Sequence, residues 1–231
     1  MRRRWFMACA GGGGIGFASP TLMSAALPDV TAALPIAGAV AGVVLGGFQA
    51  VILRSLLAGF GMRDWVLATA AGTALAWAVV SIFLRNGPWM AYAPTSVQAP
   101  LAVAGGLVLV FALGIAQWMV LRRWTERAVL WIVANAVGWT MGLVVIGLIT
   151  MPLRRSGQIA VPAAVTELVA GLVLAVISAA VTAAFLGYVL EPRYVAAPVN
   201  ARREGRRVGR PVPRPRGRFR LVLRGTGVAT T

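Results

Sequence analysis

The chain has 231 residues, of which 59% are hydrophobic and only 12% charged, and its formal net charge is +16. Soluble domains carry about 25% charged residues, so this composition excludes an ordinary soluble domain and favours membrane-spanning helices. The chain has no His and a single Cys, which excludes an intramolecular disulfide and removes the commonest metal ligand and general base. We therefore expect no cofactor and no enzymatic activity.

Six apolar runs predict an all-α membrane protein with six transmembrane helices, because lipid offers no partner to an open backbone. In chain order the predicted spans are 5–27, 35–57, 65–84, 100–121, 128–151 and 163–190. Pro20 falls inside the first span and is expected to kink it. The chain thus divides into a transmembrane domain, residues 1–190, and a C-terminal tail, residues 191–231.

Arginine counts predict the orientation of these helices, since cytoplasmic loops are enriched in basic residues. With the N-terminus inside, the inner segments before the tail hold Arg2, Arg3, Arg4, Arg54, Arg63, Arg122, Arg123 and Arg127, whereas the outer loops hold only Arg85, Arg154 and Arg155. We expect a protein of the bacterial cytoplasmic membrane with both termini in the cytoplasm. A second interpretation takes Arg3-Arg4 as a twin-arginine signal cleaved after residues 24–26, which leaves five spans.

One sequence template occurs three times and begins at Trp5, Trp65 and Trp131. It reads Trp, two apolar residues, Ala, a small residue, Ala, any residue and Gly. Residues 46–54 also align with 114–122, so spans two and three match spans four and five as hairpins. The copies run in the same membrane direction, which predicts three hairpins as parallel repeats about an axis along the membrane normal.

Four polar residues fall at one depth in these hairpins. Gln49 and Gln117 each lie five residues before an inner Arg, and Thr69 and Asn135 each lie four residues after a template Trp. At 1.5 Å per residue, all four lie about 6–8 Å into the membrane. We expect a hydrogen bond across each hairpin, from Gln to Thr or Asn, that stabilises the packing. The alternative is a polar constriction that lines a path. Cys9 has the equivalent place in the first span and is expected to be a packing residue.

Glycines at four-residue spacing predict close helix packing. Gly38, Gly42 and Gly46 form a ridge on the second span, and Gly12 with Gly16 and Gly138 with Gly142 repeat the spacing. Without a Cβ, glycine lets two helix backbones approach. We expect packing inside the bundle, with a dimer interface as the alternative.

Segments 114–122 (GIAQWMVLR) and 131–139 (WIVANAVGW) resemble a recurrent hairpin of uncharacterised bacterial multi-pass membrane proteins. Residues 42–77 match less closely, with Ala50 in the place of Trp118 and Thr73 in the place of Trp139. The resemblance implies a membrane topology and no activity.

Acidic residues are few. Glu167 comes five residues after Pro162, which places it about one turn inside the outer edge of the last span. A carboxylate within a membrane suggests a functional site, with Arg154 or Arg155 as partner. The alternative is an N-terminal acid favoured by the helix dipole. Asp64 and Glu126 are expected to pair locally with the neighbouring Arg63 and Arg127.

The tail carries 11 Arg against Glu191 and Glu204, so its net charge is 11 − 2 = +9 of the total +16. This high net charge and five prolines, which exclude a long helix, predict disorder. Each Arg near an anionic leaflet contributes about 1 kcal/mol of binding free energy. We therefore expect the tail to bind anionic lipid headgroups, with nucleic acid as the less favoured partner. The candidate lipid-binding residues are Arg202, Arg203, Arg206, Arg207, Arg210, Arg214, Arg216, Arg218 and Arg220.

The scarcity of charge within the spans predicts a non-enzymatic membrane scaffold or accessory subunit, with a second membrane protein or a further copy of the chain as partner. The alternative function is a small-solute channel or permease, with Gln49, Thr69, Gln117 and Asn135 at its inner mouth. Repetition favours this alternative, because pseudo-symmetry is a frequent way to surround a path.

Overall fold

The computed structural model describes residues 1–26, 31–156 and 163–190, so the tail and its candidate lipid-binding arginines lie outside the described residues. Within these ranges the chain forms α-helices and one 3-10 turn, η1 (Thr31–Ala33), and no strand. The helices are α1 (Arg2–Ala26), α2 (Leu34–Leu56), α3 (Met62–Tyr92), α4 (Thr95–Leu121), α5 (Val129–Ser156) and α6 (Ala163–Val189). The predicted all-helical fold class is confirmed.

Five of these helices are long and apolar enough to cross a membrane, namely α2, α3, α4, residues Val129–Leu148 of α5 and Leu168–Val189 of α6. The fold is therefore that of a multi-pass membrane protein. Among the described residues α1 does not reach the same hydropathy, because four consecutive glycines, Ser19 and Pro20 dilute its apolar residues. The sixth span, over α1, stays a prediction.

Three helix ends extend five or more residues beyond those expected. The third span was expected to end at Leu84, yet α3 continues through Pro88 to Tyr92. The fourth was expected to begin at Pro100, yet α4 begins at Thr95. The fifth span was expected to end at Met151, yet α5 continues to Ser156. Apolar runs mark where a helix meets the headgroups, whereas backbone hydrogen bonding carries the helix beyond that level.

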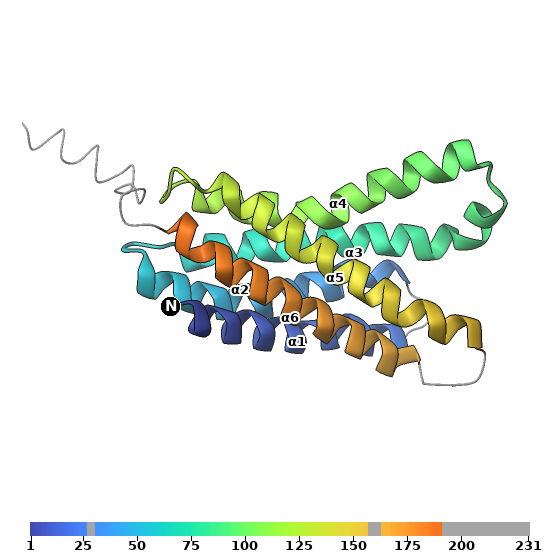
Figure 1. Ribbon diagram of the computed structural model, residues 1–231, viewed down its shortest axis with the longest axis horizontal. Helices are drawn as coiled ribbons and strands as arrows, with labels where there is room; N and C mark the ends of the chain where they lie inside the picture. The colour runs from blue at the N-terminus through green and yellow to red at the C-terminus, as the bar shows by residue number, and fades with distance from the viewer. Residues whose placement is uncertain (27–30, 157–162, 191–231) are drawn as a thin grey trace, which may run out of the picture. The chain divides into compact units, whose positions relative to one another are not determined.

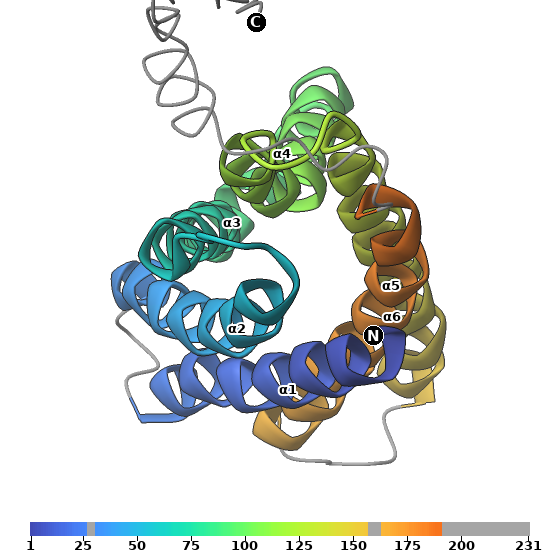
Figure 2. The same cartoon turned by 90° about the vertical axis from the view of Figure 1, so that its left-hand side faces the viewer.

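The six helices form a closed ring (Figure 2). Each helix packs against the next in the chain, and α1 packs against α6. Glycines permit the close approach: a Cβ added to Gly42 on α2 would lie 2.6 Å from Ala70 Cα and 2.8 Å from Thr69 O on α3. The predicted packing role of this glycine ridge inside the bundle is confirmed, since Gly38 and Gly46 also face side chains of α3.

The start of α1, the end of α2 and the start of α3 lie at one end of the ring, together with the α4–α5 connection (Figure 1). We call it the arginine end, because Arg2, Arg3, Arg4, Arg54, Arg63, Arg122 and Arg123 are exposed there. A cluster of buried hydrophobic residues that includes Leu53, Leu121 and Leu186 lies directly behind it.

One ion pair crosses the arginine end. Asp64 accepts a hydrogen bond from Arg123 at 2.8 Å, and both side chains are about half exposed. The expected pairing of Asp64 with its neighbour Arg63 is therefore wrong. Adjacent residues on a helix point about 100° apart, whereas the α4–α5 connection brings Arg123 directly to the start of α3.

Candidate functional site

Three tryptophans, one from each copy of the template, meet inside the ring. Trp5, Trp65 and Trp131 are at most 1% exposed. The ring centroids of Trp5 and Trp131 are 5.4 Å apart at 79°, and those of Trp65 and Trp131 are 6.1 Å apart at 59°. Such tilted contacts suit the quadrupole of an aromatic ring. The three indoles therefore fill the ring interior near the arginine end.

Each indole N–H donates to a polar side chain on an adjacent helix. Trp65 Nε1 donates to Gln49 Oε1 at 3.1 Å, and Trp131 Nε1 donates to Gln117 Oε1 at 2.9 Å. Trp5 Nε1 donates to Thr182 Oγ1 at 3.1 Å. A buried indole N–H needs an acceptor, and these contacts join α3 to α2, α5 to α4 and α1 to α6.

The amide groups of the two glutamines extend this network across the ring. Gln117 Nε2 donates to Gln49 Oε1 at 2.9 Å and to Thr69 Oγ1 at 3.0 Å. Gln49 Nε2 donates to Cys9 Sγ at 3.3 Å. The buried network thus connects residues from α1 to α5, and its members are nearly free of contact with solvent.

Gln49, Thr69 and Gln117 are brought together as predicted, but their partners differ from those expected. Thr69 binds Gln117 of the next hairpin, and Asn135 Nδ2 donates to the Trp131 carbonyl of its own helix at 2.9 Å. Within each hairpin the glutamine binds the template Trp instead. Sequence reasoning missed this partner, although an indole at the same depth as a glutamine is the signal that could have found it.

The arginine end of the ring is closed by aromatic side chains. Phe60 contacts both Trp65 and Trp124, with ring centroids 5.8 Å and 5.1 Å apart. Thr125 Oγ1 donates to the Val189 carbonyl at 2.8 Å, which ties the α4–α5 connection to the end of α6. Buried side chains are therefore packed between the glutamines and the arginine end.

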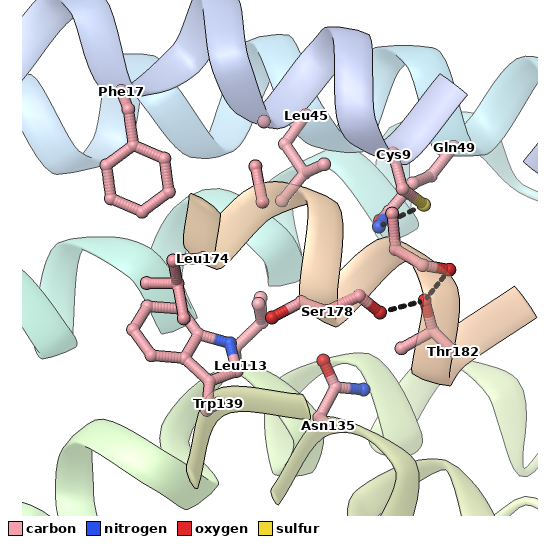
Figure 3. A pocket seen from close by; sticks show the side chains of 13 residues that line it. Cys9, Phe17, Leu45, Gln49, Leu113, Asn135, Trp139, Leu174, Ser178 and Thr182 are labelled. Carbon is pink, nitrogen blue, oxygen red and sulfur yellow. Dashed lines mark hydrogen bonds between the residues drawn. The ribbon is translucent and has the colours of Figure 1, made fainter. Parts of the chain in front are cut away.

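A small pocket of about 40 Å³ lies on the other side of the network (Figure 3). Cys9, Gln49 and Thr182 lie at one end of it, and Phe17, Leu174 and Trp139 at the other. Asn135 points into it from α5, toward α6. Ser178 of α6 also lines it, and its Oγ is buried with no hydrogen-bond partner in the protein.

The chemistry of this interior is polar and uncharged. The buried polar side chains of the described residues are Gln, Asn, Ser and Thr, and none is ionised. Glu167 is the fifth residue of α6, but its side chain lies outside the described residues. Within the described part of the chain no group of three or more His, Cys, Asp or Glu could hold a metal ion.

No known protein family, curated protein or solved structure matches the chain. The resemblance to bacterial hairpin proteins therefore stays a prediction.

Proposed function

We propose that the chain is a non-enzymatic membrane scaffold or accessory subunit. The observation that supports this proposal is the buried network inside the ring, where three indoles donate hydrogen bonds to two glutamines and a threonine. A transport path needs a continuous polar opening or a site that can be exposed in turn to either side. Here the buried polar side chains hydrogen-bond to one another, which favours a rigid body over a transport path.

The partner surface of the scaffold is proposed to lie along α4. Apolar grooves of about 350 Å³ and about 540 Å³ flank this helix, the first against α3 and the second against α5. Gly106 lines the second groove, and a Cβ added to it would meet no atom within 4 Å. Such a surface fits a transmembrane helix of a partner protein, which gains dispersion contacts where small residues let backbones approach.

Co-purification from the native membrane tests this proposal. Gly106→Leu should fill the groove beside α5 and release the partner. Gly47→Leu is the matched control, because a Cβ on Gly47 also meets no atom within 4 Å but lies on α2. Partner loss in Gly106→Leu alone supports the proposal. Equal recovery in both variants, or lipid as the sole companion, contradicts it.

A small-solute channel or permease is the second candidate, and the pocket that Asn135 and Ser178 line inside the ring favours it. Uptake into reconstituted vesicles separates the two functions. A scaffold should give the same small-polar-solute flux as empty vesicles. Flux that Gln117→Leu alters would favour the channel, since Gln117 is completely buried in the network.

We further propose that residues 191–231 bind the anionic inner surface of the membrane, as their charge of +9 suggests. Binding to vesicles with anionic headgroups should fall steeply as salt rises. Equal binding to neutral vesicles, or preferential binding to RNA, contradicts the lipid assignment.

A further inference from the structure

The two glutamines of the network share one pattern of contacts. Each accepts a hydrogen bond from the Trp of the following helix, and each donates to the residue four positions after the Trp of the preceding helix. For Gln49 the acceptor of that second bond is Cys9, and for Gln117 it is Thr69. One amide thus spans the distance between two neighbouring Trp-bearing helices.

Thr182 of α6 is the third residue in a position equivalent to those of Gln49 and Gln117. It makes only the first of the two contacts, the one with a Trp. It accepts from Trp5, while its own hydroxyl donates to the Ser178 carbonyl at 2.7 Å. The residue four positions after Trp131 is Asn135, and in the described part of the chain no side chain of α6 hydrogen-bonds to it. The hydroxyl of a threonine is two bonds closer to the backbone than the amide of a glutamine, and it carries no second polar atom for the other contact.

The pocket lies where the amide of a third glutamine would be expected, between Thr182 and Asn135. Asn135 and Thr182 line it, and so does Ser178, whose Oγ has no protein partner. A buried hydroxyl without a partner is costly. The lining residues carry no charge, which disfavours an ion, and a volume of about 40 Å³ is too small for most organic solutes.

We propose that this pocket is a hydration site that holds about two or three ordered water molecules, since one water needs about 10–15 Å³ and two to four polar partners. The waters bond Ser178 Oγ and the Asn135 amide oxygen and take the place of a third glutamine amide. The side chains of Phe17 and Leu174 that line the other end of the pocket are apolar and offer water no hydrogen bond, so the waters are held at the polar end.

The single cysteine provides a direct probe, because Cys9 lines the pocket although it is only 4% exposed. Brief X-ray irradiation of the full chain in lipid discs splits bound water and oxidises the side chains beside it, which mass spectrometry then counts. The oxidation rate of Cys9 should be well above that of Trp65, which is 0% exposed and lies in the packed network. Each rate is normalised to that in the denatured chain. Labelling of Cys9 no faster than Trp65 overturns the proposal.

Two variants test the site independently. Thr182→Gln supplies the third amide, so labelling of Cys9 should fall to the level of Trp65 and the Tm should rise by about 2–4 °C. Labelling that persists in a folded Thr182→Gln chain contradicts the proposal. Ser178→Ala should leave the Tm unchanged or lower it, because the hydroxyl is bonded to water. A clear rise in Tm would mean a dry, unpartnered hydroxyl and no water site. If Thr182→Gln does not fold, the labelling of Cys9 in the wild-type chain and the Tm of Ser178→Ala still test the proposal.

Discussion

At the scale of single residues, Gln117 is the side chain on which the buried hydrogen bonds converge. It accepts from Trp131 and donates to Gln49 and Thr69, and it is 0% exposed. Gln117→Leu should therefore leave the Trp131 N–H buried without an acceptor, at a cost of about 1–3 kcal/mol. We expect the Tm in detergent to fall by at least about 2–4 °C.

Gln98→Leu is the control for this prediction. Gln98 is partly exposed and donates to the Ala93 carbonyl at the end of α3, where water replaces the lost bond. Its Tm should change less than that of Gln117→Leu. Equal losses would mean that burial of the network adds nothing to stability.

Depth along a helix was predictable from the sequence, but hydrogen-bond partners were not. Counting residues from the inner arginines and the template tryptophans placed Gln49, Thr69 and Gln117 at one level, and the structure brings these three together. The rotation of each helix about its axis was unknown, and one residue turns it by about 100°. Asn135 was therefore paired with Gln117, although it binds the backbone of its own helix.

At the scale of helix pairs, the interface of α2 with α3 depends on glycines that cannot accept a side chain. A Cβ on Gly42 would run into Thr73 Oγ1 and the backbone of Ala70. Gly42→Ala should force the helices apart and cost about 1–3 kcal/mol. Gly47→Ala on the same helix meets nothing within 4 Å and should be neutral or stabilising, because Ala favours helix. Thermal unfolding of the pair measures the difference. A similar loss for both would contradict the packing argument.

The spacing of Gly38, Gly42 and Gly46 predicted a close contact but not which helix makes it. Their neighbours are Trp77, Thr73 and Thr69, all on α3. Adjacent antiparallel helices are the simplest assumption for a short connection, so this contact could have been inferred. The packing of α1 on α6 leaves no such local signal, because Trp5 and Thr182 are 177 residues apart in the chain.

At the scale of the whole molecule, the position of α1 decides the topology. Five of the described helices are apolar enough to span and α1 is not among them, yet α1 packs between α2 and α6 like any other member of the ring. Six spans place both termini on one side of the membrane. A cytoplasmic reporter fused after Thr231 should be active, and a periplasmic reporter between α3 and α4 should be active too. Activity of the periplasmic reporter after Thr231 would mean that α1 does not cross.

The closed ring also bears on how the repeat is arranged. The hairpins α2–α3 and α4–α5 each hold one Trp–Gln hydrogen bond. The corresponding bond of the third template joins Trp5 of α1 to Thr182 of α6, and Arg2 lies over the ring of Tyr188 at 5.9 Å. These contacts favour a third hairpin made of α6 and α1, which is split by the ends of the chain.

A circular permutant tests this arrangement. Thr231 is joined directly to Met1, so that residues 191–231 serve as the linker, and the chain is opened between Ala58 and Gly59. Both residues are exposed in the α2–α3 connection, where Gly59 has a φ of +71°. The new order is α3, α4, α5, α6, α1 and α2, with all three Trp contacts preserved. We expect a monodisperse protein whose Tm lies near that of the parent. A control opened inside α3 at Thr73, which is buried, should not fold. Failure of both permutants would mean that α6 and α1 need separate chain ends and do not form a unit equivalent to the other two hairpins.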